Sequence, residues 1–383
     1  MPKKYGVVGA GMQGTAAAYD LGRFGEADEV WISDLSWERA KASAERVNTL
    51  LQRKIAYPKE LNVTHEKGLI EFLKPLDGAL SAVPYFLNVS LTKAAIEAKT
   101  HLCDLGGNTD VVFQQLEQAS EAKKAGITVV PDCGLMPGLG NILGLYALET
   151  LGSVERIRIY CGGLPQRPTP PLNYKLVFSI EGLTNEYFGK AIVLRNGAIQ
   201  KIDTFSELEE ITFEESIGKC EAFTTSGGTS TCPWSFQDKI KYYEYKTVRY
   251  PGHYEKIKTL LDLGFLDLDA VDVRGTKVRP RDLFHALVAP RITFPHDKDL
   301  VVLRARCEGQ KETLILELID YFDDETGFSA MERTTAFPAA LVLETIVREN
   351  QARGVSSLEK TVHASSYLSE LKKRDLKMKM NSH

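Results

Sequence analysis

GAGMQG, residues Gly9 to Gly14, follows a short apolar run from Tyr5 to Val8 and precedes a helix-like segment. It is a complete G-x-G-x-x-G sequence in the strand-to-helix position that a Rossmann fold requires. Gly9 permits the tight turn, Gly11 lets the backbone approach a pyrophosphate, and Gly14 lets helix and strand pack closely. The following helix points its positive end at the phosphates. The alternative is an ordinary strand–turn–helix with incidental glycines.

An acidic residue stands where this fold selects its nucleotide. Asp34 ends the second expected strand, about 20 residues after the glycines, where a carboxylate binds both ribose hydroxyls of NAD and repels the 2′-phosphate of NADP. No arginine adjoins Asp34 before Arg39. The sequence therefore predicts NAD as the cofactor.

The end of the fourth expected strand supplies further candidate cofactor contacts. Ser81-Ala82-Val83-Pro84 ends it beside the expected nicotinamide ribose, although Pro84 can equally be a plain strand-ending proline. The residues expected to bind the cofactor are Gly9, Gly11, Met12, Gln13, Gly14, Asp34, Ser81, Val83, Pro84 and Gly106.

The first third alternates short apolar runs with amphipathic segments, which is typical of an α/β, doubly wound parallel sheet. The expected strands are Tyr5 to Val8, Val30 to Ser33, Leu61 to Thr64, Gly78 to Val83, His101 to Asp104 and Ile127 to Val130. The expected helices include Trp37 to Leu51, Leu87 to Ala98 and Thr109 to Ala125.

After Asp132 the pattern changes to an inserted α+β, mixed-sheet domain. A glycine-rich bend leads into a helix to about Leu151, and an apolar helix returns at Phe337 to Val347. We expect a Rossmann domain over residues 1–131, an inserted domain over 132–333, and a C-terminal helix packing back with a solvated basic tail over 334–383. The expected strands here are Lys175 to Ile180, Ile192 to Arg195, Lys241 to Val248, Leu300 to Arg306, Thr313 to Tyr321 and Ser329 to Arg333.

Composition excludes several classes of protein. The 383 residues are 43% hydrophobic and 26% charged with a net charge of −4, which does not favour a nucleic-acid-binding surface. No apolar run approaches the roughly 20 residues of a membrane helix, and the N-terminal stretch lacks a signal peptide. Six scattered cysteines and seven histidines show no metal-ligand spacing. These observations predict a cytoplasmic enzyme with reduced thiols, no metal and no membrane partner.

Six further motifs follow one another along the chain. They are DLGGN at 104–108, GLMPGLGNIL at 134–143, YCGGLP at 160–165, SGGTST at 226–231, EYKTVRYPGH at 244–253 and RTTAFPAA at 333–340. Their order and spacing resemble the saccharopine dehydrogenase family, most closely its lysine 6-dehydrogenase branch. The resemblance covers nearly the whole chain and implies a Rossmann domain, a mixed-sheet domain over 132–333 for substrate binding and dimerisation, and a homodimer or higher homo-oligomer.

Two departures from the saccharopine-forming branch favour a smaller substrate. Met136-Pro137-Gly138 stands where that branch carries Asp-Pro-Gly, and Thr225 to Thr229 stands where it carries a carboxylate-gripping arginine. The resemblance then implies oxidative deamination of the ε-amine of L-lysine to aminoadipate 6-semialdehyde, which cyclises, and ammonia. A saccharopine-type or carboxynorspermidine-type dehydrogenase is the enzyme alternative, and an NAD-sensing regulatory protein is the other.

Arg249 is the first candidate for the substrate carboxylate, because a guanidinium binds a carboxylate bidentately. Thr247, two residues earlier on the same strand face, adds a hydroxyl, and Thr225 and Ser226 lie in a glycine-rich loop that can present donors. A surface ion pair and a plain surface loop are the alternatives. His253, near neutral pKa in ordinary surroundings, is either a substrate contact or a helix cap.

The sequence does not single out one proton-transfer group. Asp104 ends a strand near the nicotinamide but can be a cap or turn residue. Lys246 needs a lowered pKa to act as a base, and pairing with Glu244 is equally plausible. Cys161 matches a cysteine that the resemblance associates with proton transfer, but a buried inert thiol is as plausible. The strand edges around Leu300 to Tyr321 offer places for sheet extension in an oligomer.

Overall fold

The computed structural model describes residues 3–294, 296–348 and 352–382. It divides the chain into two compact units. The parallel-sheet unit comprises Met1–Gly152, Ser230–Ser235 and Glu332–Met378, and the mixed-sheet unit comprises Ser153–Thr229, Phe236–Met331 and Lys379–His383. The observed division differs from the expected one because the helix after residue 131 and a short loop segment both belong to the parallel-sheet unit.

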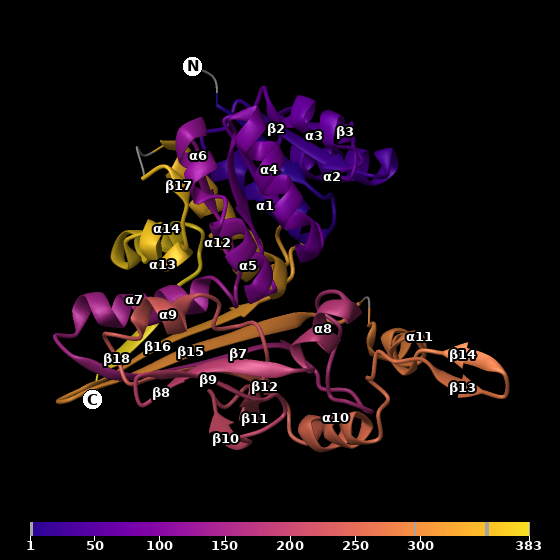
Figure 1. The fold of residues 1–383 in the computed structure, drawn as a ribbon, viewed down its shortest axis with the longest axis vertical. Helices are drawn as coiled ribbons and strands as arrows, with labels where there is room; N and C mark the ends of the chain where they lie inside the picture. The colour runs from indigo at the N-terminus through magenta and orange to yellow at the C-terminus, as the bar shows by residue number, and fades with distance from the viewer. Residues whose placement is uncertain (1–2, 295, 349–351, 383) are drawn as a thin grey trace. The chain divides into compact units, whose positions relative to one another are not determined.

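The parallel-sheet unit has the doubly wound topology that the sequence predicts (Figure 1). Within the described residues its seven strands follow the order β3-β2-β1-β4-β5-β6-β17, and every neighbouring pair runs parallel. The strand order reverses between β1 and β4, so the ligand crevice of this fold is expected at the carboxyl ends of those strands. The strands are β1 (Lys4–Val8), β2 (Glu29–Asp34), β3 (Ala56–Glu60), β4 (Gly78–Ser81), β5 (His101–Asp104), β6 (Thr128–Val130) and β17 (Gly354–Val355).

The expected third strand at Leu61 to Thr64 is wrong. The third strand is β3 (Ala56–Glu60), which ends just before Leu61. Pro58 is tolerated within it because β3 lies at the sheet edge. Asn62 Oδ1 accepts hydrogen bonds from Thr64 N at 3.0 Å and Thr64 Oγ1 at 2.7 Å. This local turn bends the chain away from the sheet.

Helices pack on this sheet in two groups (Figure 1). α1 contacts α2, and the centre of its Tyr19 ring lies 6.2 Å from that of Phe337 in α12, with the rings tilted by 32°. Further along the chain, α3 contacts α4, and α4 contacts α5. The single helix expected over Thr109 to Ala125 is two helices, α5 and α6. The helices and turns are α1 (Met12–Phe24), α2 (Trp37–Leu51), α3 (Glu66–Leu73), η1 (Tyr85–Leu87), α4 (Asn88–Ala98), α5 (Thr109–Leu116), α6 (Ala119–Ala125), α7 (Leu139–Thr150), α9 (Cys232–Phe236), α12 (Ala330–Arg348), α13 (Leu358–Thr361) and α14 (Ala364–Lys373).

The C-terminal tail is not the solvated segment that its basic composition predicts. Leu371 and Leu376 are buried, and Arg374 is 3% exposed. Arg374 donates to Asp20 Oδ2 at 2.9 Å and to Glu344 Oε1 at 2.5 Å. A buried ion triad therefore fixes the segment after α14 to α1 and α12. Met1, Pro2 and His383, which the expectations on the two termini included, lie outside the described residues.

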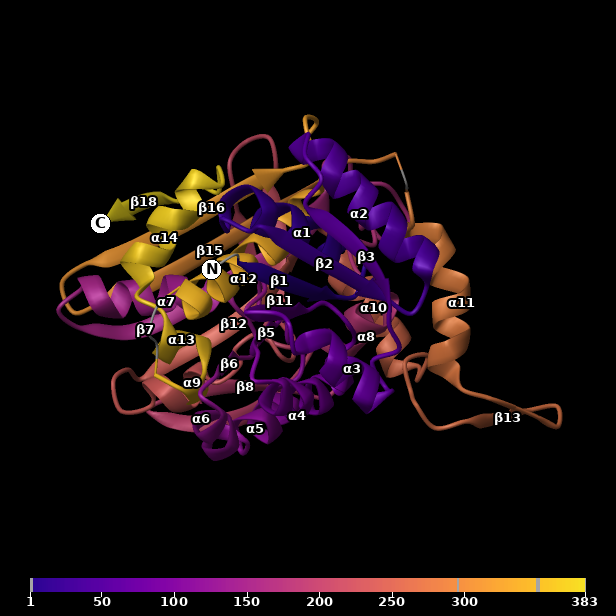
Figure 2. The same ribbon diagram turned by 90° about the horizontal axis from the view of Figure 1, so that it is seen from above.

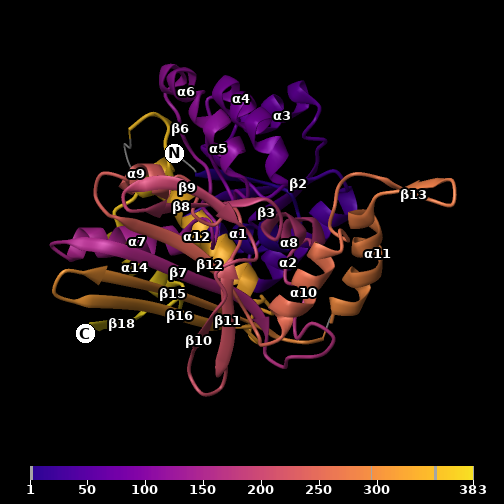
Figure 3. The ribbon, with the colours of Figure 1, turned by 60° about the horizontal axis from the view of Figure 1, so that its bottom comes forward.

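The mixed-sheet unit is built on long strands (Figure 3). In the part of the chain that the structure describes, its main sheet has nine strands along the path β10-β11-β12-β7-β15-β16-β18, with β8 on β12 and β9 on β8. Only the β12–β7 pair is parallel among the pairs of this sheet described. The strands are β7 (Val154–Pro165), β8 (Lys190–Arg195), β9 (Ala198–Asp203), β10 (Glu209–Thr212), β11 (Lys219–Thr224), β12 (Tyr242–Arg249), β15 (Asp299–Gly309), β16 (Thr313–Tyr321) and β18 (Lys379–Ser382).

In the described residues of this unit, three helices and a hairpin accompany the main sheet. A separate β13–β14 hairpin extends beyond α11 (Figure 2). The elements are α8 (Ile180–Glu186), α10 (His253–Asp262), β13 (Val271–Val273), β14 (Thr276–Val278) and α11 (Pro280–Ile292).

Two expected strands of this region are wrong. Lys175 to Ile180 forms no strand and instead leads into α8. Ser329 to Arg333 forms no strand because α12 begins at Ala330, where Asp299 accepts from Ala330 N at 2.9 Å and Met331 N at 3.0 Å.

The edges expected around Leu300 to Tyr321 are open only in part. β15 is not an edge, since β7 and β16 flank it, and β18 pairs with Leu314 to Glu317 of β16. Sheet extension in an oligomer stays a prediction.

Among the described residues, no helix combines the length and the apolar character that crossing a membrane requires.

Candidate functional site

The glycine turn after β1 has open space at Gly11, whereas Gly9 and Gly14 are closely packed against neighbouring atoms. Gly9 has φ 105°, and a Cβ there would lie 2.7 Å from Ala82 O. A Cβ on Gly14 would lie 1.8 Å from Gly9 O, whereas one on Gly11 would meet nothing within 4 Å. α1 starts directly afterwards, with Met12 exposed. These features fit a nucleotide pyrophosphate held at the start of α1.

Asp34 lies at the end of β2 beside this turn. Its Oδ2 accepts from Ala10 N at 3.0 Å, and its Oδ1 accepts from Ser36 N at 3.0 Å. Arg39 Nη2 lies 2.7 Å from Asp34 Oδ1, so the first arginine after Asp34 in the sequence contacts this carboxylate in the fold. α2 brings the two together, because Arg39 lies in its first turn.

The remaining cofactor candidates differ in accessibility. Val83 lies against the glycine turn, 3.2 Å from the position of a Cβ on Gly9. Ser81 is 1% exposed and its hydroxyl donates to Asn88 Oδ1 at 2.8 Å, so its side chain is committed to the fold. Pro84 is exposed before η1. Gly106 leaves room for a neighbouring acid, because a Cβ there would lie 1.7 Å from Asp132 Oδ1.

Two buried carboxylates lie together after β5 and β6. Asp104 accepts from Gln115 Nε2 at 2.8 Å, Gly106 N at 2.8 Å and Asp132 N at 3.1 Å. Asp104 thus ties the two strand ends together, as the turn alternative predicts. Burial raises the pKa of Asp104, while these three hydrogen bonds lower it.

Asp132 is the functional candidate that sequence reasoning missed. It has φ 59°, an unusual backbone conformation for a non-glycine residue, and Ser230 opposite it has φ 47°. Ser230 Oγ donates to Asp132 Oδ2 at 2.5 Å, and Gly107 N donates to Oδ1 at 3.3 Å. Burial, and then repulsion by Asp104, raise the pKa of Asp132 to about 7. Its place after the sixth expected strand was the available signal.

In the mixed-sheet unit, strand alternation separates the candidates of β12 into two sets. Thr247 stands opposite Cys161 of β7 on one face, with Arg249 two residues along, while Lys246 points to the other face. Lys246 Nζ donates to Glu207 O at 2.7 Å and lies 2.8 Å from Glu209 Oε1. The structure therefore does not bring Lys246 together with Arg249.

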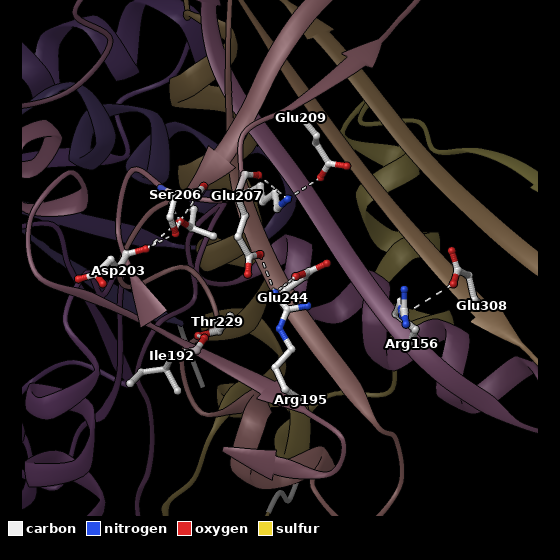
Figure 4. Close-up of polar contacts among 12 residues, drawn as sticks. Arg156, Ile192, Arg195, Asp203, Ser206, Glu207, Glu209, Thr229, Glu244 and Glu308 are labelled. Atoms are coloured by element: carbon white, nitrogen blue, oxygen red, sulfur yellow. Dashed lines mark hydrogen bonds and ion pairs between the residues drawn. The ribbon is translucent and has the colours of Figure 1, made fainter. Parts of the chain in front are cut away.

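The alternative pairing of Lys246 with Glu244 is also wrong. Glu244 lies 2.5 Å from Arg195 of β8, which also contacts Glu207 at 2.7 Å (Figure 4). Lys246 and Glu244 thus lie on the face of β12 opposite to Arg249, where Lys246 pairs with Glu209 and Glu244 pairs with Arg195.

Arg249 lies in an aromatic surrounding and is 3% exposed. Its Nε donates to Tyr187 Oη at 3.0 Å and its Nη1 to Val248 O at 2.9 Å. The guanidinium carbon is 4.8 Å from the ring centre of Tyr174, and Nη2 is 3.8 Å from Glu186 Oε2. The partners of Nε and Nη1 fix the plane of the guanidinium and leave Nη2 towards Glu186.

His253 and Cys161 are held in neutral, buried states. The ring nitrogens of His253 lie 2.9 Å from Tyr187 Oη and 3.1 Å from Leu172 O, and the residue is 0% exposed. Burial and the nearby Arg249 charge lower its pKa to about 3. Burial raises the pKa of Cys161 to about 12. His253 therefore orients Tyr187 and, through it, Arg249, and Cys161 stays a thiol at neutral pH.

The loop hydroxyls connect β12 with α8. Thr225 Oγ1 lies 2.7 Å from Thr247 Oγ1, so the structure brings these two candidates together. Ser226 donates from Oγ to Asn185 O at 2.9 Å and from its backbone N to Glu186 O at 2.9 Å. The loop therefore fixes the last turn of α8.

Among the described residues, no three His, Cys, Asp or Glu side chains form a group that could hold a metal ion.

Models of two protein domains match the chain. Residues 6–130 match the saccharopine dehydrogenase NADP binding domain, and residues 134–376 match the saccharopine dehydrogenase C-terminal domain. The chain belongs to the saccharopine dehydrogenase family. The family resemblance inferred from the six motifs is thereby confirmed, and the first unit of this family member is a pyridine-nucleotide-binding domain.

Curated relatives agree with this assignment, and a solved structure has the same fold. Saccharopine dehydrogenase [NADP(+), L-glutamate-forming] of Saccharomyces cerevisiae is 30% identical over 257 residues, covering 62% of this chain and 54% of the relative. Carboxynorspermidine synthase of Vibrio cholerae is 23% identical, covering 71% and 69%. The structure of apo saccharopine dehydrogenase (L-Glu forming) from Saccharomyces cerevisiae superposes with a TM-score of 0.78 at 20% identity, covering all of both chains. This family member spans about half the length of the first of these curated relatives.

Proposed function

We propose that the protein oxidises the ε-amine of L-lysine with NAD. A hydride leaves the ε-carbon and a proton leaves the amine, which gives an imine. Water converts the imine to aminoadipate 6-semialdehyde and ammonia, and the aldehyde cyclises on its own α-amine. The chain must therefore hold one carboxylate, accept one proton and bind one dinucleotide.

The observation that carries this proposal is the surrounding of Arg249. To this one buried guanidinium, which Tyr187 and Val248 O orient, we assign a single substrate carboxylate. The loop in which the resemblance leads one to expect a second arginine carries Thr225 and Ser226 instead, and both hydroxyls bind inside this unit. Lysine has one carboxylate, whereas saccharopine has more than one and needs a binding group for each.

The dinucleotide fits the open backbone at Gly11 and the carboxylate of Asp34, which can accept from the adenosine ribose. NAD, when bound, accepts the hydride. NAD rather than NADP is proposed because Asp34 places a negative charge where NADP carries its 2′-phosphate, although Arg39 partly offsets that charge.

The proposed proton acceptor is Asp132, at the carboxyl end of β6. Asp104 positions it by accepting from its backbone N–H, and Ser230 fixes its Oδ2. Catalytic roles for Asp104, Cys161 and Lys246 are not part of the proposal, because the first is bound by three donors, the second stays a thiol and the third lies on the far face of β12.

The test is NADH absorbance after the purified protein is mixed with NAD and L-lysine. We expect turnover of lysine with NAD and much less with saccharopine or with NADP. Turnover of saccharopine without turnover of lysine would contradict the substrate and favour the reaction that the yeast relative's name describes. Nucleotide binding without turnover of either amine would favour a regulatory protein.

Replacing Asp34 by serine is expected to shift the cofactor preference towards NADP by about 10- to 100-fold, because a like-charge repulsion disappears while Arg39 remains. The ratio of kcat/KM for NAD and NADP measures the shift. Glu38→Gln is the matched control, since Glu38 lies beside Arg39 in the first turn of α2 and is exposed to solvent. An unchanged ratio in Asp34→Ser would show that Asp34 does not select the nucleotide.

A homodimer or higher homo-oligomer stays a prediction of the family resemblance, and light scattering of the purified protein tests it.

A further inference from the structure

Glu186 faces Arg249 without forming a close ion pair. Their nearest atoms, Glu186 Oε2 and Arg249 Nη2, are 3.8 Å apart, which is beyond hydrogen-bond distance. The Glu186 side chain is 28% exposed, whereas that of Arg249 is 3% exposed. The Arg249 guanidinium is therefore buried, whereas the Glu186 carboxylate is partly exposed to solvent.

The chain fixes this separation from both sides. Arg249 is held by Tyr187 Oη and Val248 O, so it cannot move towards Glu186 without losing two hydrogen bonds. Glu186 is the last residue of α8, and Ser226 binds the backbone of that turn through Glu186 O and Asn185 O. The gap is thus a property of two anchored elements.

At this separation, Arg249 does not fully balance the charge of the Glu186 carboxylate. Burial raises the pKa of Glu186 to about 7, and Arg249 lowers it only in part. A ligand that brings both a negative and a positive group would satisfy Arg249 and Glu186 together. A simple carboxylate would instead meet the repulsion of Glu186.

We propose that Glu186 binds the α-ammonium group of the substrate while Arg249 binds its α-carboxylate, so that the site selects α-amino acids over simple carboxylic acids. This inference rests on the role that the proposed function gives to Arg249. It does not depend on lysine itself, because the lysine part of saccharopine carries the same two groups.

Two unreactive ligands test the inference by calorimetry on the protein with saturating NADH. L-norleucine carries the zwitterion without an ε-amine, and hexanoate lacks the ammonium group. We expect norleucine to bind wild type about 10- to 100-fold more tightly than hexanoate, the effect of one charge-assisted hydrogen bond. In Glu186→Gln this preference should fall to about 3-fold or less through weaker binding of norleucine alone.

Glu181→Gln is the matched control, because Glu181 is exposed on the same helix and should leave the preference unchanged. Glu186→Asp, which keeps the charge on a shorter side chain, serves if Glu186→Gln does not fold, and it should show an intermediate preference.

Equal binding of the two ligands to wild type, an equal loss of both in Glu186→Gln, or no binding of either would overturn the inference. Its failure is distinguishable from failure of the proposed function. If lysine is not oxidised but the norleucine preference depends on Glu186, only the proposed reaction fails. If lysine is oxidised and no preference exists, only the role of Glu186 fails.

Discussion

Asp132→Asn is expected to lower kcat for lysine oxidation by about 100- to 1,000-fold, which is the usual contribution of a positioned proton acceptor. Asparagine retains the size of the side chain and an oxygen that can accept from Ser230, but it cannot take a proton. KM for lysine should change little, because Arg249 is untouched. Steady-state NADH formation at several lysine concentrations measures both constants.

The pH profile separates a chemical role of Asp132 from a structural one. The pKa of Asp132 is raised to about 7, and the acceptor must be unprotonated. Wild-type kcat should therefore be high above pH 7 and fall as the pH drops below that value, whereas the residual activity of Asp132→Asn should lack this step. Asp110→Asn, on an exposed position of α5, should retain the wild-type profile. A wild-type profile in Asp132→Asn would rule out Asp132 as the acceptor.

Arg374→Ala is expected to lower the free energy of unfolding by about 3–5 kcal/mol. Arg374 is the shared partner of Asp20 and Glu344, and all three are buried. Burial already raises the pKa of Asp20 and of Glu344, while Arg374 lowers both. Without the guanidinium, two carboxylates remain in a site that water does not reach. Urea denaturation followed by circular dichroism measures the loss.

Lys373→Ala is the control for the effect of Arg374, because the neighbouring lysine is exposed and lies 2.6 Å from Glu370 in a surface ion pair. Its effect should stay below about 1 kcal/mol, as for other surface ion pairs. If the two alanine variants unfold at the same urea concentration, the triad does not stabilise the parallel-sheet unit.

The parallel sheet was predictable because its information is local. The glycines at 9–14, Asp34 and the apolar runs of β1, β2 and β5 each lie within one strand–turn–helix segment. The period of two along β12 likewise placed Thr247 beside Arg249. The same rule shows that Lys246 lies on the other face, so that candidate could have been excluded from the sequence.

The rest depends on contacts between distant segments. Asp132 and Ser230 are 98 residues apart, and Asp20 and Arg374 are 354 residues apart. Composition made the C-terminal tail look solvated, because the burial of Arg374 requires two acids from other helices. The gap between Arg249 and Glu186 depends on how Ser226 holds α8, which no local pattern encodes.

The parallel-sheet unit is made of three separate segments of the chain, and this affects how it can fold during synthesis on the ribosome. Its sheet is completed by β17, and α12 covers Gly78 of β4 through Leu343 and Val347. A nascent polypeptide that has emerged only as far as β6 therefore holds six strands with one face of β4 bare. Folding of this unit cannot finish until the segments of the mixed-sheet unit up to Met331 have been synthesised. Chaperones that shield apolar surface during synthesis are accordingly expected to bind the emerging N-terminal third.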